Sequence, residues 1–350
     1  RLRRLDEHAQ IVMIERSGYM SYANCGLPYY VGGVIKEQEE LTLQTPESFW
    51  DRFRIDVRVR QEVTAINPAE KTVTVHALDS EKIYIETYDK LLLAPGAKPT
   101  VPALSGVSSE RVFTLRTVED TLRIRRFVED QKPKTAVLAG GGFIGLEMAE
   151  NLVEMGVSVT IVQRPKQLLA PLDADMASFV HAEVRRHGVV LRLGETVTGF
   201  RQDGDSVLTL LEESEPLHSD MVLLAIGVTP DTHLAKDAGL RLGIRGSIAV
   251  NELMETSVPD IYAVGDAVEV SHFVTGQKAL ISLAGPANKQ GRIAADNICG
   301  GNSHFHGSQG SSVLKLFGLT AASTGINEKA AQAAGIAYDK VILLSLIHIS

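Results

Sequence analysis

Three glycines, Gly140, Gly142 and Gly145, have the spacing G-x-G-x-x-G and constrain the fold more than any other feature of the chain. A β-branched run over 135–139 precedes them, a helical pattern follows, and a second apolar run covers 157–163. Together these segments form a βαβ pattern of about 30 residues, the unit from which parallel sheets are built. The pattern therefore predicts an α/β fold with a parallel sheet around this unit.

The same glycines predict a ligand. The first allows a tight turn, the second lets the backbone approach a pyrophosphate, and the third lets the helix pack on the strand. The helix N-terminus then points unpaired N–H groups at the phosphates. The alternative is a tight turn without a ligand, which the combination of strand, spacing and helix disfavours. Gln163 closes the next strand, where an acid would favour NADH by binding the ribose; with Arg164 beside it, the choice of nicotinamide stays open.

Other segments indicate a second, related nucleotide-binding unit. The strand and turn at 91–99 resemble those at 223–230. Glu15 ends a buried strand at 11–14, where it would read a ribose or simply be a solvated carboxylate. Asp266 follows another buried strand, where an acid would meet a polyol hydroxyl or a phosphate, although Asp is also common in turns without a ligand.

Cys25 lies in a loop after the first strand, between Asn24 and Gly26. A lone cysteine is usually a small buried apolar residue. If a helix begins here, its N-terminus lowers the thiol pKa and favours the thiolate. The only other cysteine, Cys299, is distant in the sequence, and no C-x-x-C occurs. We therefore expect Cys25 to react with an external thiol or a sulfur substrate.

Composition excludes several classes of function. Lys and Arg total 35 against 43 Asp and Glu, a net charge of −8, which argues against nucleic acid as the main partner. No apolar run reaches the roughly 18 residues of a membrane-spanning helix. Two cysteines in 350 residues suit a reducing, cytoplasmic compartment. His304 and His306 lie in a linker without carboxylate or cysteine partners, so we assign them no metal and no role.

The chain resembles the group of coenzyme A disulfide reductases, NADH oxidases and NADH-dependent persulfide reductases among the FAD-dependent pyridine nucleotide-disulfide oxidoreductases. The resemblance runs from residue 1 to about 344 and is most specific in the loop ERSGYMSYANCGLPYYVGG at 15–33. The other matching segments are LLLAPGAKP at 91–99, GGGFIGLEMAENL at 140–152, TSVPDIYAVGDAVEV at 256–270 and AGPANKQGRIAADNICG at 284–300.

The resemblance implies an α/β fold with two Rossmann-like dinucleotide-binding domains, for FAD and NAD(P)H, the second inserted in the first. The start of an α+β interface domain and a homodimer are also implied. The expected ranges are 1–115 and 235–305 for FAD, 116–234 for NAD(P)H, and 312–350 for the interface. The family's N-terminal FAD glycine loop is absent and the interface domain is cut short, so we expect a fragment that holds FAD poorly, with a foreign tail at 345–350.

The resemblance also implies the site residues. Cys25 would be the redox cysteine facing the flavin, with Ser21 and Asn24 near the bound thiol. Arg3 and Arg4 are candidates for the coenzyme A phosphates. The implied FAD contacts are Glu15, the turn Ala94-Pro95-Gly96, and Asp266. The implied NAD(P)H contacts are Gly140, Gly142 and Gly145, with Phe143 over the nicotinamide side of the flavin and Glu147 nearby. Gln163, from its place at the strand end, completes the expected NAD(P)H contacts.

The implied activity is electron transfer from NAD(P)H through flavin to Cys25, which reduces a small-thiol disulfide or persulfide of the coenzyme A type. One alternative is an NADH oxidase or peroxidase in which Cys25 cycles through a sulfenic acid. Another is a catalytically inactive nucleotide-binding fragment. The physiological acceptor stays open among coenzyme A disulfide, coenzyme A persulfide, polysulfide and oxygen.

Overall fold

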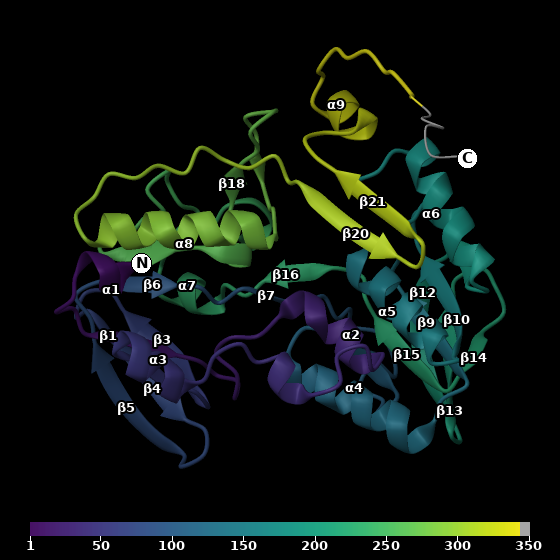
Figure 1. Cartoon of the computed structure of the whole chain (residues 1–350), viewed down its shortest axis with the longest axis horizontal. Coiled ribbons are helices and arrows are strands. Elements are labelled where there is room, and N and C mark those ends of the chain that lie inside the picture. Colours follow the sequence, from purple (N-terminus) through teal and green to yellow (C-terminus); the bar gives the residue numbers. More distant parts are fainter. Residues whose placement is uncertain (344–350) are drawn as a thin grey trace.

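The computed structural model describes residues 1–343. The expected foreign tail at 345–350 lies outside the described residues. Two α/β units lie side by side, and a C-terminal hairpin with a short helix lies above the second unit (Figure 1). Over the part of the chain that is described, no helix is both long and apolar enough to cross a lipid bilayer.

The second unit contains the glycine motif. Its five-stranded parallel sheet has the order β11-β10-β9-β15-β8. The strands are β8 (Val112–Thr114), β9 (Thr135–Ala139), β10 (Ser158–Gln163), β11 (Val190–Leu193) and β15 (Met221–Leu224). Its helices are α4 (Val118–Gln131), α5 (Phe143–Glu154) and α6 (Ala174–Arg186), and an antiparallel sheet of β12 (Val197–Asp203), β13 (Ser206–Leu211) and β14 (Leu217–Ser219) is attached. The predicted βαβ unit is confirmed.

The first unit is built from two distant parts of the chain. In parallel pairs, β1 (Ile11–Ile14) lies beside β2 (Ile55–Arg58), and β6 (Leu91–Leu93) beside β17 (Ile261–Ala263). The hairpins β3 (Gln61–Asn67), β4 (Thr72–Ala77) and β5 (Lys82–Thr87) form an antiparallel sheet. The helix α8 (Ala284–Ile298) contacts α1 (Leu2–Leu5). Residues before and after the second unit thus share one core, which agrees with the expected insertion.

The two units are joined where the similar segments noted in the sequence meet. β7 (Ala97–Pro99) and β16 (Val228–Pro230) pair as an antiparallel ladder. β8 belongs to the second sheet, because it pairs with β15. The boundary expected at 115/116 therefore falls after a strand of the inserted unit, and the chain enters that unit before Val112. Thr117 and Asp120 form a capping box that fixes the start of α4.

Several short elements complete the fold. They are η1 (Asn24–Gly26), α2 (Leu27–Val31), η2 (Gln38–Glu40), α3 (Pro46–Phe53), α7 (His233–Asp237), η3 (Ile244–Gly246), η4 (Gly265–Ala267), β18 (Val270–Ser271) and β19 (Lys278–Ala279). The helix α2 packs against both α4 and α5 of the second unit. This packing brings the loop that contains Cys25 to the helix that begins at the glycine motif.

The C-terminal hairpin, β20 (Ser312–Leu316) and β21 (Leu319–Ser323), docks on α5 and α6, and α9 (Glu328–Ala333) follows it. At the hairpin turn, the N–H of Phe317 donates to Glu150 Oε1 at 2.8 Å, and the N–H of Gly318 donates to Glu183 Oε1 at 3.0 Å. Both carboxylates are buried. The hairpin is therefore held by charge-assisted hydrogen bonds as well as by apolar contacts.

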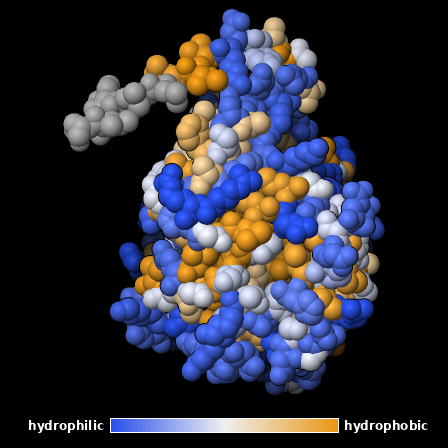
Figure 2. Space-filling model, turned by 90° about the vertical axis from the view of Figure 1, so that its right-hand side faces the viewer, coloured by the Kyte–Doolittle hydropathy of each residue, from blue (hydrophilic) through white to orange (hydrophobic). Residues whose placement is uncertain are grey.

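The face on the α6 side exposes apolar residues among polar ones (Figure 2). Exposed apolar side chains of this region include Met176 and Phe179 of α6 and Val190 of β11. Phe179 keeps 50% of its surface accessible. Single exposed apolar residues are ordinary, whereas a contiguous group of them is typical of a surface that another molecule covers.

Candidate functional site

The glycine motif forms a tight loop between β9 and α5. Gly140 has φ +115°, and a Cβ there would lie 2.2 Å from the carbonyl oxygen of Ala225. A Cβ on Gly145 would lie 2.1 Å from the carbonyl oxygen of Gly140, whereas a Cβ on Gly142 would meet nothing within 4 Å. Gly142 is the N-cap of α5 and no side chain caps the helix. Gly140 and Gly145 are thus required by packing, whereas Gly142 leaves open space in front of the uncapped helix N-terminus. A pyrophosphate fits this space and can accept from the free N–H groups.

Gln163, at the end of β10, is held inside this loop. Its Oε1 accepts a hydrogen bond from the N–H of Gly141 at 3.0 Å, and its Nε2 donates to the carbonyl of Gln167 at 3.2 Å. Arg164, the next residue, is exposed, and no hydrogen bond or ion pair to another described residue engages its guanidinium. The amide of Gln163 is therefore already engaged within the protein, whereas the guanidinium of Arg164 beside it is available to a ligand.

Glu147 lies on α5, one turn beyond Phe143, on the helix against which α2 packs. Burial, followed by the charge of Glu150, raises the pKa of Glu147 from the ordinary 4.5 to about 7. Burial and then these same two carboxylates also raise the pKa of Tyr29 on α2. The pKa of this carboxyl group is therefore raised close to neutrality, on the helix against which α2 packs.

Cys25 lies in η1, directly before α2. The residue is exposed, while the next residues, Gly26 and Leu27, are buried. Partial burial of the thiol, followed by the charge of Glu147, raises the pKa of Cys25. The expectation that a helix N-terminus lowers this pKa is wrong, because burial and the charge of Glu147 raise it instead.

The neighbours of Cys25 assigned from the resemblance lie in the same loop. Ser21 is half-buried and Asn24 is exposed. Within the described part of the chain, neither side chain is engaged in a hydrogen bond, so both are available to a ligand beside the thiol.

The residues expected to contact FAD each follow the carboxyl end of a parallel strand. Glu15 follows β1 and its Oε1 accepts from the N–H of Ser17 at 2.7 Å. Ala94 and Gly96 follow β6, and Gly96 has φ +69°. Asp266 follows β17 in η4. In parallel sheets, ligands bind outside these carboxyl ends, so the arrangement fits a second dinucleotide.

Two partners in this region were missed by sequence reasoning. The guanidinium of Arg116 donates to Asp266 at 3.0 Å and to the carbonyl of Ala97 at 3.0 Å. Gln290 of α8 is buried and accepts from the N–H of Gly265 at 2.7 Å. These contacts join residues 150 and 25 positions apart, and no local pattern marks them.

Arg3 and Arg4 differ in what they can bind. The guanidinium of Arg3 donates to the carbonyls of Phe53 and Arg54 at 2.8 and 2.9 Å, and to those of Asp6 and Glu7. Four of its five N–H groups are thus used to fix α1 to the end of α3. Arg4 is exposed and has no such contacts among the described residues, which leaves it as the better candidate for a phosphate.

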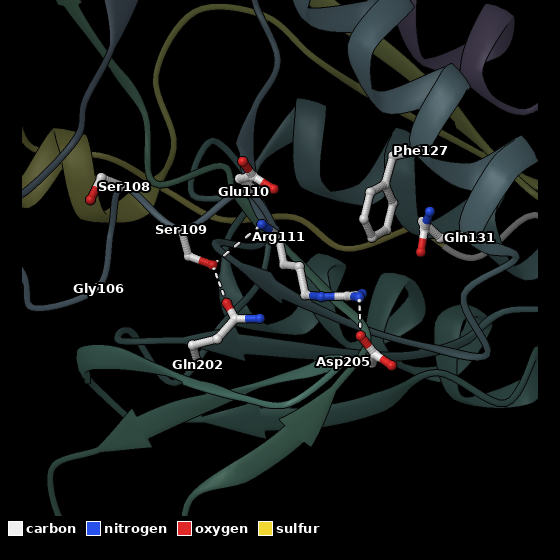
Figure 3. A pocket seen from close by; sticks show the side chains of 9 residues that line it. All are labelled: Gly106, Ser108, Ser109, Glu110, Arg111, Phe127, Gln131, Gln202 and Asp205. Atoms are coloured by element: carbon white, nitrogen blue, oxygen red, sulfur yellow. Dashed lines mark hydrogen bonds and ion pairs between the residues drawn. The ribbon is translucent and has the colours of Figure 1, made fainter.

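A hollow of about 680 Å³ lies elsewhere in the second unit (Figure 3). Arg111, just before β8, crosses it and pairs with Asp205 at 3.5 Å, while Ser109 donates to Gln202 at 2.8 Å. Because the strands are parallel, the start of β8 is at the sheet edge opposite the glycine loop. The hollow is therefore separate from the dinucleotide site, and its cation is already paired.

Comparison with known proteins agrees with this geometry. The family model for pyridine nucleotide-disulphide oxidoreductases matches residues 1–291. The chain is 37% identical over 330 residues to an NAD(P)H sulfur oxidoreductase (CoA-dependent) of Pyrococcus abyssi, covering 94% of this chain and 72% of that protein. It is 34% identical to a coenzyme A disulfide reductase of Staphylococcus aureus, with 93% and 73% covered. The chain belongs to the pyridine nucleotide-disulphide oxidoreductase family, as expected from its motifs.

Solved structures are similar over most of the chain. The structure of reduced Bacillus anthracis CoADR-RHD has 48% identity and a TM-score of 0.94, covering 97% of this chain and 61% of that one. The water-forming NADH oxidase from Lactobacillus brevis, bound to NADH, has 31% identity and a TM-score of 0.90, with 96% and 74% covered. The present chain thus spans less than two thirds of the Bacillus protein. The α/β fold with two dinucleotide-binding units and the expectation of FAD and NAD(P)H as cofactors are confirmed.

Proposed function

We propose that the protein is an FAD-dependent NAD(P)H oxidoreductase that passes electrons to Cys25, which reduces a small-thiol disulfide or persulfide of the coenzyme A type. The observation that carries this proposal is the position of Cys25. The residue is exposed and directly precedes α2, which packs against α5, the helix that begins at the glycine motif. The names of the Pyrococcus and Staphylococcus relatives support the same substrate class.

The residues that would hold the cofactors belong to the two units. The free N–H groups at Gly142, with Gly140 and Gly145 shaping the loop, would hold the NAD(P)H pyrophosphate. Glu15, the turn at Ala94 and Gly96, and Asp266 would hold FAD. When bound, the two cofactors supply the hydride and electron-transfer chemistry that no side chain of the protein provides.

Cys25 supplies the sulfur chemistry. Its thiolate attacks one sulfur of the substrate disulfide, which bonds to Cys25 while the other sulfur leaves as a thiolate and takes a proton. Two electrons, delivered from NAD(P)H, and one proton then release the second thiol and regenerate the Cys25 thiolate. Ser21 and Asn24 would orient the substrate sulfur, and Arg4 would meet a phosphate of the carrier.

Glu147 would donate and accept the proton that this cycle consumes. Its pKa of about 7 is close to neutrality, which suits a group that gives and takes protons near neutral pH. When Glu147 is protonated, its charge no longer opposes the Cys25 thiolate. Protonation of Glu147 and ionisation of Cys25 therefore favour each other.

A second candidate is an oxidase or peroxidase that ends at oxygen or peroxide, with Cys25 cycling through a sulfenic acid. The observation that favours it is that Cys25 is exposed while Cys299 follows the end of α8, outside the loop, so a sulfenic acid at Cys25 has no resolving cysteine close in the sequence. The similarity to the Lactobacillus oxidase supports the same possibility. Release of thiol from coenzyme A disulfide, against formation of water or peroxide from oxygen, separates the two candidates.

The test is a Cys25→Ser variant of the FAD-loaded chain, with Cys299→Ser as its matched control. We expect Cys25→Ser to abolish NAD(P)H-dependent reduction of coenzyme A disulfide, coenzyme A persulfide and polysulfide while NAD(P)H still bleaches the flavin absorbance. Cys299→Ser should keep both reactions. Disulfide reduction that survives in Cys25→Ser would refute the role of Cys25.

We also propose that the protein is a cytoplasmic homodimer. The exposed apolar residues of α6 and β11 are typical of a surface that a partner molecule covers, which supports the dimer. Sedimentation velocity of the purified chain tests the dimer directly.

A further inference from the structure

A second hollow, of about 310 Å³, lies between α8 and the segment that follows it. After α8 the chain turns and runs back along the helix (Figure 1). Lys289 and Arg292, three residues apart on α8, line one side, and His304 and His306 line the other. We refer to Lys289, Arg292, His304 and His306 as the basic groove. The remaining lining residues are Ile293, Phe305 and Gly307, so no carboxylate faces the basic groove from its lining.

The returning segment is held rigidly. Asn297 of α8 exchanges hydrogen bonds of 2.8 Å with the backbone of Ser303. Phe305 is buried and its N–H donates to the carbonyl of Glu252 at 2.8 Å. Gly307 has φ +90° and lies so close to Ser271 that a Cβ would be 2.3 Å from its carbonyl oxygen. Because alternate residues of an extended segment point to opposite sides, burying Phe305 directs His304 and His306 outward together, with ring planes 7° apart.

The cations of the basic groove are not paired with acids. Among the described residues, Lys289, Arg292 and His306 make no side-chain hydrogen bond or ion pair, and the ring of His304 is hydrogen-bonded only to the carbonyl of Asn302. The nearest acid along the helix, Asp296, is taken by Arg1 at 2.7 Å and by the hydroxyl of Ser303. In a chain with a net charge of −8, cations gathered without a counter-charge repel one another and favour an anion between them.

The basic groove is distinct from both dinucleotide sites. On α8, Gln290 points to the loop of Asp266, where it accepts from the N–H of Gly265. At about 100° per residue, Lys289 lies about 100° to one side of Gln290 and Arg292 about 160° to the same side, so the two cations are only about 60° apart and face away from Gln290. The glycine loop at Gly140 belongs to the other unit.

We propose that the basic groove is a binding site for a dianionic phosphate group, with Lys289 and Arg292 as the charged donors and the two histidines completing the shell. The guanidinium offers a fork of N–H donors that matches phosphate oxygens, and the ammonium adds a point charge. The phosphate can come from inorganic phosphate or from the 3′-phosphate of a coenzyme A thiol. The site does not rest on the proposed redox function, because binding there needs no electron transfer.

The test is isothermal titration calorimetry at low ionic strength with the 350-residue chain, using inorganic phosphate, coenzyme A and 3′-dephospho-coenzyme A as probes. The site variant is Lys289→Gln with Arg292→Gln. The matched control is Lys82→Gln with Arg201→Gln, which removes the same two charges from exposed residues of β5 and β12. We expect the site variant to weaken phosphate binding by roughly tenfold or more, because two charge-assisted contacts are lost, and the control to bind as the unchanged chain does.

The probes distinguish the sources of the phosphate. Tighter binding of coenzyme A than of the dephospho form, lost in the site variant, assigns the groove to the carrier's 3′-phosphate. Binding of inorganic phosphate with no difference between the two carriers assigns it to the free ion. His304→Ala with His306→Ala, which leaves α8 unchanged, should also weaken phosphate binding. Equal phosphate affinity in the site variant and the unchanged chain, or no binding of any probe, would overturn the proposal.

Discussion

Replacing Glu147 by Gln should stabilise the folded protein at high pH and leave it almost unchanged at low pH. The folded-state pKa of Glu147 is about 7 against an ordinary value of 4.5. A gap of about 2.5 pH units corresponds to roughly 3 kcal/mol at about 1.36 kcal/mol per unit. This is the largest difference in unfolding free energy that the substitution can produce through ionisation alone.

The sign follows from proton binding. Between pH 4.5 and 7 the folded state keeps a proton on Glu147 that the unfolded state has lost, so the unchanged protein loses stability as pH rises through this window. Gln cannot ionise and removes that loss. The expected gain is near zero at pH 4 and reaches about 3 kcal/mol by pH 8. Urea unfolding at pH 5 and pH 8, followed by fluorescence and circular dichroism, measures it.

Glu154→Gln is the matched control, because Glu154 lies on the same helix but is exposed. It should change stability little at either pH. A second readout is the rate at which iodoacetamide alkylates Cys25 as a function of pH in a Cys299→Ser background. Since the charge of Glu147 raises the pKa of Cys25, Glu147→Gln should lower the midpoint of that profile. A gain that does not depend on pH, with an unmoved alkylation profile, would refute the reasoning.

Three further substitutions test the remaining contacts. Gly145→Ala should destabilise the second unit by about 1–3 kcal/mol, because its Cβ would lie 2.1 Å from a carbonyl oxygen. Gly142→Ala should fold normally but weaken NAD(P)H binding. Thermal melts measure the first effect and NAD(P)H titration measures the second. Arg164→Ala should lower kcat/KM for NADPH by roughly tenfold and spare NADH, because it removes a cation that would meet the 2′-phosphate; an equal loss for both would exclude that role. Glu183→Ala should leave the N–H of Gly318 without its acceptor, which costs about 1–3 kcal/mol and should speed hydrogen exchange of that amide. Unchanged exchange protection of the Gly318 amide would contradict the account of the hairpin turn.

Local patterns predicted the elements around the motifs. The strands expected at 11–14 and 135–139 agree with the structure to the residue. Each is short, β-branched or apolar, and bounded by a turn signal, so the information lies within the segment itself. The start of α4 is likewise marked locally, because its capping box is a contact between residues only three positions apart.

Contacts across the chain could not be predicted in this way. The pairing of Arg116 with Asp266 depends on how the two units come together. For Cys25, the local argument considered a helix N-terminus and could not include Glu147, which the fold brings from another unit. Likewise, Gln163 was identified as the end of a strand, but its hydrogen bond to Gly141 depends on the conformation of a separate loop.

The helix α5 combines a local sequence motif with contacts to distant parts of the chain. Its N-terminus carries Gly142 of the dinucleotide loop, Glu147 faces the segment of Cys25, and Glu150 accepts the N–H of Phe317 in the C-terminal hairpin. Burial, followed by the charge of Glu150, raises the pKa of Glu147, and burial, followed by the charge of Glu147, raises that of Cys25. A sequence pattern gives the spacing of these carboxylates along α5, but only the packing of α2 and of the hairpin onto α5 brings Glu147 toward the cysteine and Glu150 to the N–H of Phe317.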